Sequence, residues 1–176
     1  NLGVFLQWQG IHGAQNFVAG ARIDNNEQFG THTTGNVDYA LDLTSGYRLN
    51  MGYGTAFKSP SFNDLYYPGF GTPTLDVETS SSFEIGLSGD SYRGHWSIRG
   101  FQTSIEDLIG YDPVTWASVN VDKARINGFE FEWDGLVRAG MLKNWEMGTS
   151  LTLSDPIDRS TDKQLPRRSK KVIQLD

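Results

Sequence analysis

The stretch Phe129-Glu130-Phe131-Glu132-Trp133-Asp134 alternates aromatic and acidic side chains without a break. Successive side chains of a β-strand point to opposite faces, so a strand here would place the aromatic rings on one face and the carboxylates on the other. A helix would mix the two kinds of side chain around its circumference. The stretch therefore predicts a β-strand that separates an apolar surface from a polar one.

The same alternation recurs along the whole chain and predicts an all-β, antiparallel fold of about nine strands. The expected strands lie near residues 4–8, 16–24, 37–43, 47–57, 83–87, 95–111, 129–134 and 145–153, with an incomplete last strand from 169.

The connections between these strands alternate in length. Short turns are expected near residues 10–15, 44–46, 90–94 and 136–143, and longer loops near 25–32, 59–78, 112–117 and 155–168. All six prolines fall in the second set: Pro60, Pro68, Pro73, Pro113, Pro156 and Pro166. Proline cannot donate to a β-ladder, so we expect proline-free strands. Short turns at one end and longer loops at the other are typical of an up-and-down transmembrane β-barrel.

The aromatic residues fit this prediction. Trp8, Phe17, Tyr47, Trp96, Trp133 and Trp145 lie next to short turns, and Phe57 and Tyr111 lead into the opposite loops. Two aromatic girdles would then flank a lipid-facing apolar band. The other face would line a wet lumen with Arg22, Asp38, Asp42, Arg48, Glu84, Glu130, Glu132 and Glu146. Alternation alone leaves a soluble antiparallel sandwich open, with the aromatic rings in its core.

Composition narrows the classes of function. The chain has 176 residues, a net charge of -6 and no cysteine. A mildly acidic chain argues against nucleic acid as the main partner. Without cysteine there is no disulfide framework and no thiolate metal site. The mean hydropathy of -0.43 and the lack of a long apolar run exclude a membrane-spanning helix but leave a barrel open.

Catalytic and metal sites find little support in the sequence. His12, His32 and His95 are far apart, so a hydrolytic triad or a zinc site is not expected. The run 24–27 followed by Gly30 departs from the spacing of a calcium loop and favours an Asn- and Asp-rich turn. We therefore expect no catalytic residue, no metal and no cofactor.

Several longer motifs identify a family. The stretch 52–66 ends a strand in Phe57-Lys58-Ser59-Pro60 and continues into the pair Leu65-Tyr66. The box 72–80 then opens a strand that contains Glu84-Ile85-Gly86, and the run 124–130 reads Ala-Arg-Ile-Asn-Gly-Phe-Glu. Together these motifs resemble the TonB-dependent outer-membrane receptor family. Read alone, Asn127-Gly128 would predict a hairpin turn, but the resemblance places it inside a strand.

Within that family the chain is most similar to the cobalamin (vitamin B12) receptors. The similarity rests on the runs 24–30, 107–112 and 165–170. It implies that residues 1–176 form a section of a larger barrel of about 22 strands, with the plug domain before it and further strands after it. It also implies a Gram-negative outer membrane, contact with lipid and lipopolysaccharide, and energised import of cobalamin through the TonB complex, which acts on the plug.

Two alternatives stay open at this point. One is a TonB-dependent receptor for a siderophore, haem or another large nutrient. The other is a small complete barrel of porin or adhesion type.

The resemblance also implies candidate ligand contacts. The first arginine of the Leu-Pro-Arg-Arg run, Arg167, corresponds to a position that faces the corrinoid in cobalamin receptors. The alternative for Arg167 is a solvated or lipopolysaccharide-facing basic cluster with Arg168, Lys170 and Lys171. The loop residues Phe62, Tyr66, Tyr67 and Phe70 are predicted to be extracellular and would either stack on ligand or pack between loops, packing being slightly favoured.

Overall fold

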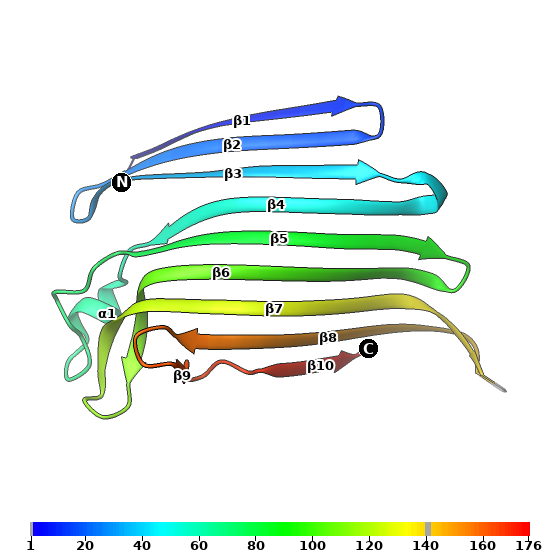
Figure 1. Cartoon of the computed structure of the whole chain (residues 1–176). Coiled ribbons are helices and arrows are strands. Elements are labelled where there is room, and N and C mark those ends of the chain that lie inside the picture. Colours follow the sequence, from blue (N-terminus) through cyan, green and yellow to red (C-terminus); the bar gives the residue numbers. More distant parts are fainter. Residues whose placement is uncertain (1, 140–141) are drawn as a thin grey trace.

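The computed structural model describes residues 2–139 and 142–176, which form one continuous antiparallel sheet (Figure 1). Its strands are β1 (Leu2–His12), β2 (Gln15–Asn26), β3 (Gly30–Asp42), β4 (Tyr47–Lys58), β5 (Glu78–Ser91), β6 (Gly94–Asp112), β7 (Ala117–Ala139), β8 (Leu142–Asp158), β9 (Lys163–Gln164) and β10 (Lys171–Leu175). The order is β1-β2-β3-β4-β5-β6-β7-β8-β10, and the short β9 also pairs with β8. The predicted all-β, up-and-down arrangement of about nine strands is confirmed.

At one end of the sheet, the connections that the structure describes are tight turns. There β1 and β2 are joined through Gly13 and Ala14, β3 and β4 through the 3-10 turn η1 (Thr44–Gly46), and β5 and β6 through Tyr92 and Arg93. The centre of the predicted turn 136–143 lies outside the described residues. We call this the short-turn end, and it is on the right in Figure 1.

The opposite, loop end holds the helix α1 (Phe62–Tyr66) in the β4–β5 connection and β9 in the β8–β10 connection. The long loop predicted at 25–32 was wrong, because β2 runs to Asn26 and β3 begins at Gly30. The connection predicted at 112–117 lies where expected, but it is a short turn of residues 113–116 between β6 and β7. The Asn26 side chain accepts hydrogen bonds from the backbone N–H groups of Gln28 and Phe29, and the Asp112 carboxylate accepts one from Val114. The polar residues that suggested long loops therefore close tight Asx-type turns.

The prediction of proline-free strands was also wrong, because Pro156 lies inside β8, fully buried and opposite Ile126 of β7. The Pro156 carbonyl accepts a hydrogen bond from the Leu165 N–H on the side away from β7. Since the N and C=O of a strand residue point to the same side, the missing N–H faces the β9 side rather than the β7 ladder. Pro156 therefore removes no bond between β7 and β8.

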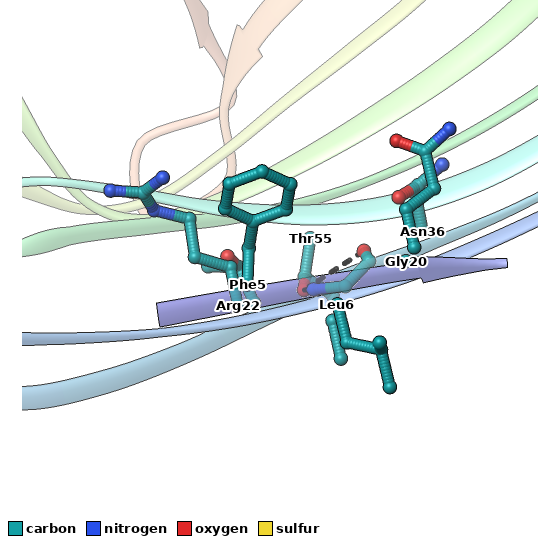
Figure 2. A pocket seen from close by; sticks show the side chains of 10 residues that line it. Phe5, Leu6, Gly20, Arg22, Asn36 and Thr55 are labelled. Atoms are coloured by element: carbon teal, nitrogen blue, oxygen red, sulfur yellow. Dashed lines mark hydrogen bonds between the residues drawn. The ribbon is translucent and has the colours of Figure 1, made fainter. Parts of the chain in front are cut away.

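The two faces of the sheet differ as predicted. The register places Asp38 beside Gly52, Gly52 beside Glu84, and Glu84 beside Phe101, so these positions share one face. On that face the Arg99 guanidinium bridges the carboxylates of Glu84 and Glu130. Figure 2 shows Arg22 and Asn36 pointing to this side and Leu6 to the other. Phe5 is an apolar exception on the polar side, also visible in Figure 2.

The opposite face is apolar and uncovered. Leu6, Val37 and Phe83 keep 77%, 57% and 50% of their surface exposed. No second sheet packs on this face among the described residues, in contrast to a soluble sandwich, whose apolar faces bury each other. None of the described helices is long and apolar enough to cross a membrane. This face therefore needs an apolar environment outside the chain.

Aromatic residues cross the sheet in a row at the short-turn end. Phe17 packs on Tyr39 with ring centroids 4.9 Å apart, Tyr47 approaches Trp96 at 6.0 Å, and Trp96 lies opposite Trp133. The predicted girdle at this end is confirmed in its geometry. At the loop end, Phe57 stacks on His32 at 4.6 Å, but Tyr111 joins no girdle and packs inside the loops, so that part of the prediction was wrong. The regular alternation stops before Tyr111, at Asp107, whose φ is 53°.

Gly128 shows why the Ala-Arg-Ile-Asn-Gly motif belongs to a strand. It lies opposite Phe101 within β7, and a Cβ atom here would overlap the Phe101 ring. The aromatic ring thus covers the bare backbone of the neighbouring strand, which a larger residue at position 128 would prevent. The interpretation of Asn127-Gly128 as strand rather than hairpin is confirmed.

Candidate functional site

The β4–β5 loop, residues 59–77, is a folded unit rather than an open excursion. Ser61 caps α1 by accepting a hydrogen bond from the Asp64 N–H, and the Asp64 carboxylate accepts one from the Ser61 N–H, which completes a capping box. The α1 helix buries Leu65, and Leu75 is buried further along the loop. The two buried leucines and the capped helix start stabilise the loop.

Polar side chains fasten the same loop to the strands below it. The Asn120 side-chain amide of β7 accepts from the Asp76 N–H at 2.9 Å and donates to the carbonyls of Asp76 and Asp107. The Glu78 carboxylate accepts from the Ile109 N–H at 3.0 Å. The Ser118 N–H donates to the Phe70 carbonyl at 3.0 Å. These contacts place the loop over the ends of β6 and β7.

A small apolar cluster supports this end from below. It consists of Ile105, Leu108, Ala124 and Leu165, with Val121 and Ile126 packed against it. Ile105 and Leu108 are three residues apart on β6, so both can share one cluster only because the alternation is interrupted at Asp107. Leu165 brings in the β8–β10 connection. The cluster thus packs the β8–β10 connection against the ends of β6 and β7.

The meeting point is marked by an aromatic and cationic stack. Phe70 of the β4–β5 loop stacks on Tyr111 at the end of β6, with centroids 5.4 Å apart and planes at 16°. The Arg167 guanidinium carbon lies 4.9 Å from the centroid of the same Tyr111 ring. Trp116 meets the edge of Tyr111 at 6.2 Å. The guanidinium is thereby positioned by a cation–π contact.

Beside this stack lies a cleft of about 340 Å³, which we call the loop cleft. It is lined by Lys58, Asp64, Phe70, Leu108, Ile109, Gly110, Tyr111, Ser118, Val121, Leu165, Pro166, Arg167 and Arg168. Aromatic and aliphatic groups thus alternate with three cations and one carboxylate. Such a lining suits a large ligand with apolar ring edges and peripheral amide or phosphate oxygens.

The backbone at Arg167 is unusual. Its φ is 57°, in the left-handed region that residues other than glycine seldom adopt. The neighbouring backbone is fixed on both sides, because the Leu165 N–H donates to Pro156 and the Gln164 side chain donates to the Arg168 carbonyl at 2.8 Å. These bonds hold the turn in which Arg167 projects over Tyr111.

The pKa of Asp64, the carboxylate of the loop cleft, is lower than its ordinary value. Partial burial acts to raise the pKa of Asp64, but hydrogen bonds from the Ser61 hydroxyl and N–H, the charge of Lys58 and the Ser118 hydroxyl together lower it. Asp64 therefore stays ionised at neutral pH and keeps its place in the capping box.

The predicted site residues divide into two groups. Arg167 and Phe70 meet at the loop cleft. Phe62, Tyr66 and Tyr67 are exposed on the outer side of the loop, with Phe62 at 74% exposure and 5.2 Å from Tyr66. The Gln28 amide donates to the Tyr66 hydroxyl at 3.3 Å, which ties the β2–β3 turn to α1.

The sequence analysis did not predict that Tyr111, Lys58 and Asp64 line the loop cleft. Tyr111 contacts partners 41 and 56 positions away in the chain, at Phe70 and Arg167. Its only signal was its position within the run 107–112. The loop cleft therefore forms only when connections that are distant in the sequence come together in the folded chain.

The histidines lie apart from one another in the part of the chain that the structure describes. His32 stacks on Phe57 and bonds to the Phe29 carbonyl, whereas His95 contacts Asp90 at the far end of the sheet. Within residues 2–139 and 142–176 no group of His, Asp and Glu is arranged to hold a metal ion. In the run 24–27, Asp24 pairs with Arg22 and Asn26 closes its turn.

The family model described as TonB dependent receptor-like, beta-barrel, matches residues 1–175. The chain belongs to the TonB-dependent receptor family. It is therefore a β-barrel protein of the Gram-negative outer membrane, and its uncovered apolar face has the environment that it requires.

Two curated relatives are similar to most of the chain. The chain is 38% identical over 161 residues to the vitamin B12 transporter BtuB of Photobacterium profundum, covering 88% of this chain and 26% of the relative. It is 34% identical over 166 residues to the vitamin B12 transporter BtuB of Vibrio vulnificus, covering 90% of this chain and 26% of the relative. The chain thus spans about a quarter of the length of the curated relatives that it matches.

Solved structures share the fold at lower identity. The copper transporter OprC superposes with a TM-score of 0.79 at 20% identity, over 98% of this chain and 30% of that one. The siderophore receptor PirA from Pseudomonas aeruginosa superposes with a TM-score of 0.73 at 20% identity, over 88% of this chain and 31% of that one. At this identity the likeness concerns the barrel architecture alone.

Proposed function

We propose that this chain forms part of the barrel wall of an outer-membrane receptor that takes up cobalamin. The observation that carries the proposal is the 34–38% identity to vitamin B12 transporters over 88–90% of the chain. In this proposal residues 1–176 are a section of a larger barrel, and a plug domain and further strands belong to the same polypeptide. The section acts in binding and transport and has no enzymatic role.

The loop cleft supports the ligand part of the proposal. A corrinoid offers a broad ring with amide groups at its edge and a phosphate in its side arm. Arg167 presents a planar fork of donors to such oxygens, while Phe70 and Tyr111 supply flat apolar surface next to it. The cleft of about 340 Å³ would hold one edge of the ligand, and other loops would hold the rest.

The faces of the sheet support the remaining parts. The polar face, with the Glu84–Arg99–Glu130 bridge, would line the lumen and contact the plug, on which the TonB complex pulls. The apolar face would contact lipid, with lipopolysaccharide near the loop end. By the general rule for such barrels, the short-turn end would be periplasmic and the loop end extracellular.

The test is ligand binding by the complete polypeptide in detergent. Cyanocobalamin, ferric enterobactin and Cu²⁺ would be titrated in parallel by isothermal calorimetry. The proposal predicts saturable binding of cyanocobalamin alone. Binding of ferric enterobactin or Cu²⁺ without cyanocobalamin would reject cobalamin as the substrate and leave the family assignment intact.

A further inference from the structure

A second hollow lies at the short-turn end of the sheet. It measures about 440 Å³ and is lined by Tyr92 and Arg93 from the β5–β6 turn and by Trp133, Leu136 and Val137 from β7. It lies at the opposite end of the strands from the loop cleft. We call it the turn groove.

The backbone of the turn groove is fixed by close contact between the β5–β6 turn and β7. The Leu136 N–H donates to the Arg93 carbonyl at 3.1 Å. A side chain at Gly135 would collide with that carbonyl and with the Trp133 ring. Glycine at position 135 therefore lets the turn lie directly on β7 and lets the Trp133 ring extend along the strand.

The groove combines an apolar floor with a cation at its rim. Trp133 belongs to the aromatic row at the short-turn end and shares the apolar face with Val137, which lies opposite Trp145, whereas Leu136 lies opposite Glu146. The Arg93 guanidinium carbon lies 5.0 Å from the centroid of the Tyr92 ring, which is 88% exposed. Among the described residues no carboxylate lies within 4.0 Å of Arg93, so its charge is not neutralised there by an ion pair.

We propose that the turn groove binds a glycerophospholipid of the periplasmic leaflet, with the lipid phosphate on Arg93 and the glycerol and upper acyl chain on Trp133 and Val137. Two observations select this occupant: Trp133 and Val137 in the groove belong to the lipid-facing side of β7, and the cation at the rim complements a phosphate. The inference rests on the membrane placement proposed above and adds a specific lipid site to it.

The experiment uses the complete polypeptide in a mild non-ionic detergent. Phosphatidylglycerol and diacylglycerol would be titrated separately, and retained lipid would be counted by native mass spectrometry. These lipids share acyl chains and differ in the phosphate. We expect one phosphatidylglycerol to be retained about tenfold more tightly than diacylglycerol, the difference that one charge-assisted hydrogen bond supplies. Millimolar inorganic phosphate should not displace it, because a free ion lacks the acyl contacts.

Arg93→Gln should bring phosphatidylglycerol retention down to the level of diacylglycerol, and Arg93→Lys should keep most of it. Arg159→Gln is the matched control, since Arg159 is an exposed arginine at the loop end. Heat-modifiable migration would confirm that each variant is folded. Unchanged retention in Arg93→Gln, or an equal loss in Arg159→Gln, would overturn the site. Lipid retained without preference would reject this site alone, whereas no lipid retention at all would also contradict the membrane placement.

Discussion

Replacing Arg167 by alanine should weaken cobalamin binding without disturbing the barrel. Alanine keeps the Cβ atom, so the left-handed backbone at φ 57° is no easier or harder to adopt than before. The fold loses one exposed cation–π contact with Tyr111, worth about 0.5–1 kcal/mol. The ligand loses a hydrogen bond to a charged donor, worth about 1.5–3 kcal/mol. The dissociation constant should therefore rise roughly 10- to 150-fold.

The assay is calorimetric titration of the complete polypeptide with cyanocobalamin. Arg167→Lys should fall between the parent and Arg167→Ala, because lysine keeps the charge and loses the planar fork. Arg159→Ala removes an exposed arginine elsewhere at the loop end and should bind like the parent. A parent-like dissociation constant for Arg167→Ala, in protein that still shows heat-modifiable migration, would refute a ligand contact at this position.

Three further perturbations test the fold and the loop. Leu151→Arg on the lipid face should lower the unfolding free energy by about 2–4 kcal/mol in urea titrations of lipid-reconstituted protein. Ser150→Arg, one residue along and on the polar face, should lower it far less. Equal losses would contradict the assignment of faces. Gly128→Leu should reduce the heat-modifiable fraction because its side chain overlaps Phe101, and adding Phe101→Ala should restore part of it; no gain in the double variant would argue against the overlap. Ionised Asp64 has a lowered pKa in the folded loop, so its contribution to loop docking is complete above the ordinary carboxyl pKa of about 3.9 and is lost as the pH falls through the lower folded-state pKa. Proteolysis of residues 59–77 should therefore increase in that acidic range. A pH dependence of proteolysis in Asp64→Asn like that of the parent would contradict the reasoning.

The faces of the sheet could be predicted from the sequence because they follow from local alternation. The run 129–134 places its aromatic rings and carboxylates on opposite faces whatever its neighbours are, and the register then extends that division across the sheet. The resemblance to the family likewise rested on contiguous motifs.

Features that depend on distant partners could not be predicted in the same way. Pro156 is tolerated inside β8 only because its nitrogen faces away from β7. Tyr111 gains its role from Phe70 and Arg167, which reach it from two other connections. The prediction of a long loop at 25–32 was wrong for a local reason. The polar composition of this segment suggested an open loop, but the Asn26 side chain closes a tight turn.

The central claim is that one face of this sheet meets lipid and the other does not. Residues 1–176 contain no cysteine, so single spin labels can be attached through Phe129→Cys, Glu130→Cys, Phe131→Cys and Glu132→Cys in the lipid-reconstituted complete polypeptide, with any cysteine outside these residues replaced by serine. The measurement is the collision rate of each label with molecular oxygen, which concentrates in the bilayer. We predict high oxygen accessibility at 129 and 131 and low accessibility at 130 and 132. Labels at 129 and 131 that are immobilised and closed to oxygen would indicate a buried protein core and would contradict the account.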